Sequence, residues 1–240
     1  MMAKRQAFKI DMHVHSMYSG ESPAEPRDIV EAAKEKGLDA IVITEHERLS
    51  LSLPFEELRK TAGHLKIFRG VELSTDAGHM LVYGVTDEDW KDWGADRVCS
   101  AQELIARSAK LGGLAIPAHP YSLEKRNAFD NAPSVVVDER IKHLTGLKAL
   151  EVCNGKHSRF PEVCEVLGRY AASVNLPGIG GSDAHMPEEV GRAYTSFRVP
   201  VYSARDIVRE ILRGHVWPQA DSLKLTTSRI SAFVICEISM

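Results

Sequence analysis

The sequence predicts an α/β fold in which most strands form a parallel sheet. Short apolar runs alternate with helical patterns along the 240-residue chain, which is typical of repeated βα units. Hydrophobic residues make up 44% of the chain and charged residues 26%, as in a globular protein with a sizeable core. Because α/β barrels often exceed 200 residues as one unit, we expect a single domain over residues 1–240.

The expected elements follow in order along the chain. Residues 8–15 alternate like a strand, and the next helix begins at Pro26 and ends before Gly37, since Pro favours the first helical turn and Gly the position after the last. Ser100 and Glu103 form a capping box that begins another helix. The other expected strands are 40–44, 66–73, 79–85, 114–118, 149–152, 178–181 and 195–199, and the other helices are 161–174 and 203–213.

Three regions are harder to assign. Residues 121–138 lack a clear period and are expected to form a loop over one face. Residues 200–240 should form a C-terminal helix and tail that complete or flank the barrel. Within them, the apolar run 230–238 is expected to be a strand or a docked tail.

Charge and cysteine usage narrow the classes of function. The chain has 30 Lys and Arg against 33 Asp and Glu, so tight non-specific binding to nucleic acid, which needs many basic contacts to phosphates, is not expected. Cys99, Cys153, Cys164 and Cys236 include no Cys-x-x-Cys pair, which favours neither a disulfide framework nor a zinc ribbon. With no signal segment and no membrane-spanning apolar stretch, we expect a cytoplasmic protein without a membrane partner.

Histidine and acidic side chains gather at the ends of the predicted strands. His13 and His15 end the first strand, where the period of two points both imidazoles to one side. Strand ends meet at the active-site rim of an α/β barrel. Imidazoles and carboxylates without thiolates suit Zn, Mn or Fe, and nine such groups suffice for two or three ions. They are His13, His15, Glu21, His46, Glu72, His79, His119, Asp183 and His185.

Five ordered motifs resemble those of the PHP family, which is named for polymerase and histidinol phosphatase. The resemblance spans roughly residues 8–200 and implies a metal-dependent phosphoesterase on a distorted (β/α)7 barrel. Two further segments, 150–155 and 190–195, resemble members in which a short C-terminal segment completes the barrel. The five motifs are DMHVHS at 11–16, ITEH at 43–46, GVE at 70–72, AHP at 118–120 and GSDAH at 181–185.

The resemblance also implies a division of the ligands. It implies His13, His15, Glu72 and Asp183 around one ion, Glu72, His79 and His119 around a second, and Glu21, His46 and His185 around a third. Asp183 or His185 would transfer the proton, and Lys156, Arg159 and Arg192 would bind the substrate. We expect Asp11 to orient His13 or His15 through the second imidazole nitrogen rather than to bind an ion.

The expected function is hydrolysis of a small phosphomonoester or phosphodiester, such as a phosphorylated metabolite or a short nucleotide, by a metal-activated hydroxide. An amidohydrolase is an alternative, because that class also begins with His-x-His at a strand end. The chain has no suitable bridging-lysine pattern, however, and its Asp-x-His ending differs. A non-catalytic PHP module that serves a partner is the other alternative, although all the ligand positions are filled here.

Overall fold

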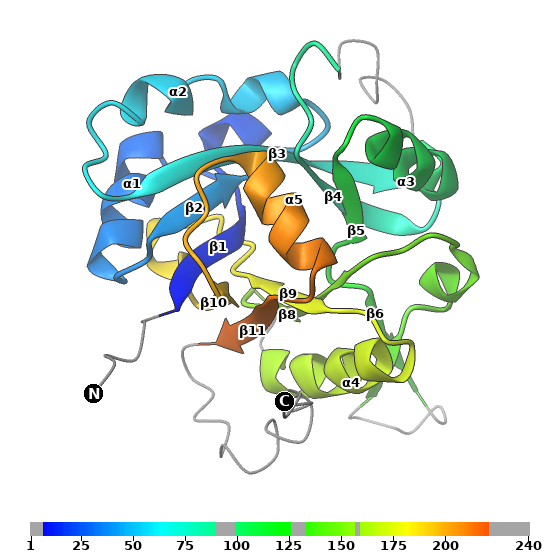
Figure 1. Cartoon of the computed structure of the whole chain (residues 1–240). Coiled ribbons are helices and arrows are strands. Elements are labelled where there is room, and N and C mark those ends of the chain that lie inside the picture. The colour runs from blue at the N-terminus through cyan, green and yellow to red at the C-terminus, as the bar shows by residue number, and fades with distance from the viewer. Residues whose placement is uncertain (1–6, 90–98, 126–132, 157–158, 221–240) are drawn as a thin grey trace, which may run out of the picture.

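The computed structural model describes residues 7–89, 99–125, 133–156 and 159–220. A curled seven-stranded sheet forms most of a barrel (Figure 1). Its strands are β1 (Phe8–Val14), β2 (Ala40–Ile43), β3 (Lys66–Thr75), β4 (Gly78–Tyr83), β5 (Leu114–Pro117), β10 (Ala193–Phe197) and β11 (Val216–Ala220). They lie in the order β11-β10-β1-β2-β3-β4-β5.

A second, two-stranded parallel sheet closes the barrel. Its strands are β8 (Leu150–Asn154) and β9 (Gly178–Gly181). The segment after β9 pairs with β1, since the amide of Asp183 donates to the carbonyl of His13 at 2.8 Å. On the other side, the Glu151 carboxylate of β8 accepts from the amide of His119, just beyond β5, at 2.7 Å. The predicted α/β barrel is therefore confirmed, with the expected distortion.

The sheet is less parallel than the sequence predicts. Strands β1, β2 and β3 are parallel, but β4 runs antiparallel to both β3 and β5. Only Asp76 and Ala77 separate β3 from β4, which suffices for a hairpin, whereas a parallel crossover needs a dozen residues or more. As a consequence β4 begins, rather than ends, at the rim where β1 to β3 end. His79, the second residue of β4, therefore lies at this rim.

Helices cover the outside of the barrel (Figure 1). Ile29, Val30 and Ala33 of α1 pack on the outer face of β2, while Leu104 and Ile105 of α3 pack on β4 and β5. The predicted N-cap of α3 is confirmed, because the Ser100 hydroxyl accepts from the amide of Glu103. The helices are α1 (Pro26–Glu35), α2 (Phe55–Leu58), α3 (Ala101–Lys110), α4 (Phe160–Ser173) and α5 (Ala204–Leu212), with short 3-10 turns η1 (Met17–Ser19), η2 (Leu49–Ser52), η3 (Glu139–His143) and η4 (Pro187–Glu189).

Helix α5 closes one end of the barrel. Its Ile207, Val208 and Ile211 join the same buried cluster as the inward side chains of the sheet, such as Ile10 and Met12. A Cβ atom built on Gly84, just beyond the last residue of β4, would lie 2.8 Å from Val208. Since β4 begins at the rim that holds the histidines, α5 lies at the opposite end. Apolar packing and the candidate ligands thus occupy separate ends, as in other α/β barrels.

Two predicted regions differ from expectation. The expected loop 121–138 contains an antiparallel pair, β6 (Tyr121–Glu124) and β7 (Ser134–Val137), while residues 126–132 lie outside the described part. Strand β11 was not predicted, because Pro218 weakens a strand pattern. It is tolerated here since β11 is an edge strand. The apolar run 230–238 lies outside the described residues, among which no helix is both long and apolar enough to cross a membrane.

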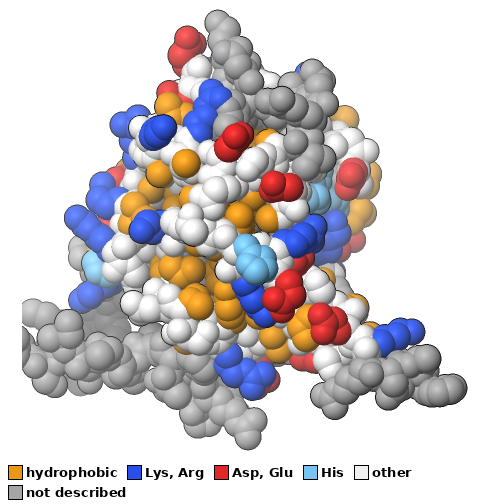
Figure 2. All heavy atoms as spheres, turned by 90° about the vertical axis from the view of Figure 1, so that its right-hand side faces the viewer, with side chains coloured by type: hydrophobic (Ala, Val, Ile, Leu, Met, Phe, Trp, Pro, Cys, Tyr) orange, Lys and Arg blue, Asp and Glu red, His pale blue; other side chains and the backbone are white. Residues whose placement is uncertain are grey.

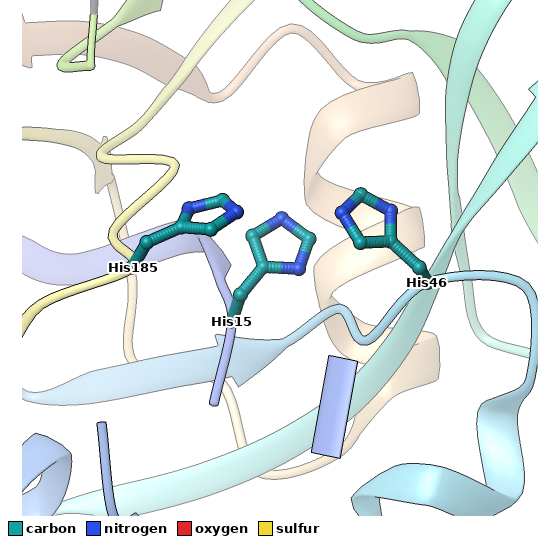
Figure 3. Close-up of side chains that lie close together, drawn as sticks. All are labelled: His15, His46 and His185. Atoms are coloured by element: carbon teal, nitrogen blue, oxygen red, sulfur yellow. The ribbon is translucent and has the colours of Figure 1, made fainter. Parts of the chain in front are cut away.

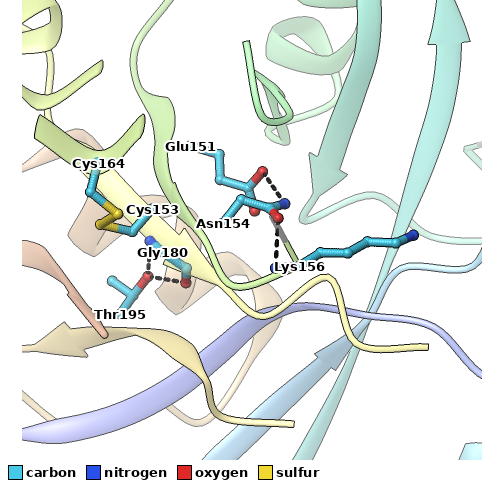
Figure 4. The surroundings of a disulfide bond; sticks show 7 residues. All are labelled: Glu151, Cys153, Asn154, Lys156, Cys164, Gly180 and Thr195. Carbon is cyan, nitrogen blue, oxygen red and sulfur yellow. Dashed lines mark hydrogen bonds between the residues drawn. A yellow bond between two sulfur atoms is a disulfide. The ribbon is translucent and has the colours of Figure 1, made fainter. Parts of the chain in front are cut away.

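The expectation that the cysteines form no disulfide is wrong for one pair. Cys153 at the end of β8 and Cys164 in α4 are joined by a disulfide bond (Figure 4). Their Cα atoms lie 4.7 Å apart because α4 folds back onto β8. Sequence spacing does not reveal this proximity, since it depends on how the connection between strand and helix turns. Disulfide bonds are rare in the reducing cytoplasm, so this bond gives no support to the expected cytoplasmic location.

We expect Cys153→Ser and Cys164→Ser each to lower the free energy of unfolding by about 2 to 3 kcal/mol, the typical value for a short closed loop. Either substitution removes the same cross-link, so the two values should agree in urea denaturation. A reductant should lower the stability of the wild type and of the control Cys99→Ser, which keeps the disulfide, but not that of the two variants that lack it. A wild type whose stability is unchanged by reductant would contradict this expectation.

Candidate metal centre

The rim of the barrel brings together eight of the nine predicted metal ligands. Most of them lie at or just beyond strand ends, while Glu72 lies within the second half of β3 and His79 at the beginning of β4. Among the described residues, ligand atoms within 4.8 Å of one another form three groups. The groups are His13, His15 and Asp183, then Glu72, His79 and His119, and finally His15, His46 and His185. That these groups bind metal ions remains a prediction.

Glu72 lies at the centre of the cluster. Its Oε2 atom is 3.1 Å from Nε2 of both His13 and His15, and 3.3 Å from Nδ1 of His46. Its Oε1 atom is 3.0 Å from Nδ1 of His79 and 3.1 Å from Nε2 of His119. One buried carboxylate therefore faces five imidazoles, and its two oxygens face different groups. A carboxylate placed in this way could supply one oxygen to each of two cations.

Hydrogen bonds fix which nitrogen of His13 and His15 faces the cluster. Nδ1 of His13 lies 3.0 Å from the Glu151 carboxylate, which can only accept. Nδ1 of His15 lies 3.1 Å from the hydroxyl of Ser19, which itself donates to Glu45. In the neutral form of each ring Nδ1 is therefore the protonated nitrogen, and the Nε2 lone pair is directed at the cluster.

The two lone pairs point at each other. Nε2 of His13 and Nε2 of His15 are 2.9 Å apart, an arrangement that is repulsive unless one of them carries a proton or a cation lies beside both. The carboxylate oxygens of Glu72 and Asp183 approach the same place, at 3.1 Å and 3.4 Å from the His15 nitrogen. Two imidazoles with two carboxylates suit a divalent ion such as zinc. The residues thus fit the metal centre that the motifs imply.

The third group consists of imidazoles alone. The rings of His15, His46 and His185 face one another (Figure 3), with His15 4.4 Å from His46 and 4.6 Å from His185 between ring centroids. Glu21, the ninth predicted ligand, is 68% exposed and its Oε2 atom lies 3.8 Å from Nε2 of His46. It stands beside this group without being part of it.

Two of the candidate ligands have unusual backbone conformations. His119 and Asp183 have φ angles of 33° and 53°, in the left-handed region that side chains other than glycine seldom adopt. Such conformations cost about 1 to 3 kcal/mol each and concentrate at functional sites. Hydrogen bonds hold both positions, since the amide of His119 donates to Glu151 and that of Asp183 to the His13 carbonyl.

The surrounding charges shift the imidazole pKa values in opposite directions. Burial alone would lower the pKa of His13, but the negative charges of Glu72, Asp183 and Glu151 raise it well above its usual value. The pKa of His15 is raised for similar reasons, against its burial, by Asp183 and Glu72. By contrast, burial dominates at His46 and lowers its pKa to about 4. His46 is therefore neutral at pH 7.

The three predicted substrate-binding cations differ in their surroundings. Nζ of Lys156 lies 3.2 Å from the His185 ring and 3.9 Å from Oδ1 of Asp183, at the edge of the cluster. Arg159 instead pairs with Glu162 at 2.6 Å, and Arg192 pairs with Glu189 at 3.2 Å. Lys156 is thus the predicted cation that reaches the candidate centre.

The expected role of Asp11 is wrong. Its carboxylate accepts from the backbone amides of Ser182 and Gly191, each at 2.8 Å, and from that of His13 at 3.3 Å. It fixes the chain where three segments meet, and the imidazole of His13 is held by Glu151 instead. A signal for Glu151 was available, since an acidic residue inside an otherwise apolar strand is seldom buried without a function.

Two comparisons find known sequences that this chain resembles. Residues 163–216 match a family model described as PHP-associated. The protein MJ1587 of Methanocaldococcus jannaschii is 32% identical over 124 residues, which cover 48% of this chain and 68% of MJ1587.

Solved structures share the fold at low sequence identity. The lesion-specific endonuclease PfuEndoQ of Pyrococcus furiosus has a TM-score of 0.57 and 19% identity, over 88% of this chain and 57% of its own. An amidohydrolase of Chromobacterium violaceum has a TM-score of 0.58 and 16% identity, over 89% of this chain and 99% of its own. The matched PHP-associated segment begins in α4, beyond four of the five motifs, and together with the motifs and the relative it shows that this chain belongs to the PHP family.

Proposed function

We propose that this protein is a metal-dependent phosphoesterase that hydrolyses a small phosphomonoester or phosphodiester. One observation carries the proposal. The Oε2 atom of the buried Glu72 lies 3.1 Å from Nε2 of both His13 and His15, which are 2.9 Å apart, and two imidazoles beside a shared carboxylate suit a divalent cation. Two further groups of ligand atoms adjoin it, which suits two or three ions of Zn, Mn or Fe.

Bound ions of this kind lower the pKa of water and neutralise phosphoryl oxygens. The chain's own residues supply the rest. Asp183 or His185 takes up the proton from water, and both lie at the edge of the cluster. The pKa of His185 is lowered, first by burial, so its ring is neutral at pH 7. Lys156, beside them, binds the phosphoryl oxygens of the substrate.

The charge distribution favours a small substrate over long nucleic acid. The net charge is -3, and on the face that Figure 2 shows, basic and acidic side chains are scattered around apolar and uncharged groups. A polyanion gains affinity from each phosphate that Lys or Arg neutralises. Lys156 is the predicted cation that reaches the candidate centre, which suits a substrate with one or two phosphates. Arg159 and Arg192 are further candidates for binding the substrate.

The amidohydrolase alternative is weaker on the site itself. In that class a lysine joins two ions, whereas here the two oxygens of the Glu72 carboxylate face two different groups of candidate ligands. Lys156 approaches from β8 with a half-exposed side chain and contacts His185. The non-catalytic alternative is weaker because every motif retains its ligand.

The decisive experiment combines elemental analysis with a substrate panel. We expect two or three transition-metal ions per chain and hydrolysis of para-nitrophenyl phosphate, its bis ester or mononucleotides, with little turnover of long duplex DNA or of amides. Lys156→Ala should raise KM about tenfold, the effect of losing one charge-assisted contact, and leave the metal content unchanged. Hydrolysis of amides or of long DNA with small phosphoesters untouched would show that the proposal is wrong.

A further inference from the structure

Strand β8 supplies none of the predicted ligands, yet two of its polar side chains are buried at the centre. Glu151 and Asn154 are 0% and 3% exposed, and Figure 4 shows both side chains on the same side of the strand, away from the disulfide. Burying a carboxylate is costly unless it is paired and hydrogen-bonded. The partners of Glu151 therefore indicate why it is there.

The two oxygens of Glu151 hold two different candidate ligands. Oε1 accepts from Nδ1 of His13 at 3.0 Å, and this contact fixes the tautomer that turns the Nε2 lone pair toward the cluster. Oε2 accepts at 2.7 Å from the amide of His119, whose φ of 33° needs such support. One carboxylate thus joins the strand ends of β1, β5 and β8.

Asn154 extends this pair to a third ligand. Its Nδ2 donates to Oε2 of Glu151 and to Oδ2 of Asp183, each at 3.2 Å. Its Oδ1 accepts from the amide of Lys156 at 3.1 Å, so the same side chain also shapes the turn that carries the lysine (Figure 4).

We propose that Glu151 and Asn154 are the positioning residues of the metal centre, with Glu151 setting the tautomer of His13. This inference rests on the metal-binding part of the proposed function. Groups that orient a metal-bound imidazole typically change metal affinity 10- to 100-fold when they are altered. Glu151 and Asn154 contact three candidate ligands of the first two groups, namely His13, His119 and Asp183. His15 is instead held by its contact with the Ser19 hydroxyl.

Glu151→Gln gives the sharpest test, because it keeps the volume and removes one acceptor. If the amide oxygen accepts from the backbone of His119, the amide nitrogen donates to Nδ1 of His13. The proton of that ring then lies on Nε2, the atom that should bind the ion. We expect Mn²⁺ titrated into the metal-free variant to bind at least one site about 10- to 100-fold more weakly than in the wild type.

The matched control is Glu210→Gln, which alters another buried glutamate. Glu210 lies in α5, at the far end of the barrel, and pairs with Arg213 and His215. It should lose stability and keep wild-type Mn²⁺ affinity. Equal Mn²⁺ affinity in Glu151→Gln and the wild type would overturn the inference and leave the proposed function standing, whereas a wild type that binds no Mn²⁺ or Zn²⁺ would overturn the proposed function.

A second measurement does not depend on the folding of the variant. NMR of the imidazole nitrogens of the zinc-loaded wild type should show His13 protonated at Nδ1, with an N–H proton shifted downfield by its carboxylate acceptor. His13→Ala identifies the signal by its loss. A His13 ring protonated at Nε2 in the wild type would also overturn the inference.

Discussion

Glu72→Ala should reduce phosphoester hydrolysis by about a thousandfold or more and remove most of the bound metal. Its two oxygens face different groups of ligand atoms at 3.0 to 3.3 Å, so the substitution affects two ions at once. Charge stabilisation by metal ions contributes several kcal/mol to such reactions, and each 1.36 kcal/mol is about a factor of ten in rate. Elemental analysis and initial rates on para-nitrophenyl phosphate measure both effects.

His185→Ala is the comparison for this experiment. His185 belongs to one group of ligand atoms rather than two, and its side chain is nearer to solvent than that of Glu72. We expect its loss to lower the metal content less than loss of Glu72. Equal metal content in the two variants would contradict the central position assigned to Glu72.

Gly181→Ala should damage the centre from outside the ligand set. A Cβ atom at Gly181 would overlap Cβ of His13 and lie 2.8 Å from the backbone nitrogen of His13 and 3.0 Å from Oε1 of Glu151. Backbone cannot yield as a flexible side chain does, so we expect about 3 kcal/mol of destabilisation, at the upper end for overpacking. The metal content should fall with it, because the displaced atoms belong to His13 and its partner Glu151.

Gly168→Ala provides the matched glycine substitution. Gly168 lies within α4, and a Cβ atom there would meet nothing within 4 Å. Removing a glycine from a helix interior should stabilise the protein by about 0.5 to 1 kcal/mol. Urea denaturation and elemental analysis of both variants give the comparison. A Gly181→Ala protein with wild-type stability and metal content would show that β9 and β1 are less closely packed than described.

Much of the fold could be predicted from local patterns. The alternation that ends at His13 and His15, the capping box at Ser100 and the glycine-rich strand Gly178–Gly181 each carry a signal within a few residues, and the corresponding elements formed. The direction of β4 is not given by its own pattern, because a strand pattern reads the same in both directions. It follows from the link before it, since the predicted strands 66–73 and 79–85 leave five residues between them, too few for a parallel crossover.

The candidate metal centre could likewise be predicted only in part. Residue types at strand ends predict which side chains meet, since the topology of the barrel brings those ends together. They do not predict which carboxylate supports which imidazole. Asp11 and Glu151 are both buried acids near His13. Which of them contacts the His13 imidazole depends on the directions of the side chains in the folded chain, where Glu151 meets His13 although they are 138 residues apart in the sequence. The Cys153 to Cys164 bond depends likewise on how α4 packs against β8.

The disulfide at the end of β8 also has a consequence for handling the protein. Cys153 lies between Glu151 and Asn154 in the sequence, so reduction releases from α4 the strand that carries both positioning residues. Dithiol reagents add a second effect, because thiolates bind zinc and related ions strongly. Preparation in a dithiol buffer would therefore strip the centre by two routes at once. A phosphine reductant, which carries no thiol, separates them, and a preparation without reductant is the state in which metal stoichiometry should first be measured.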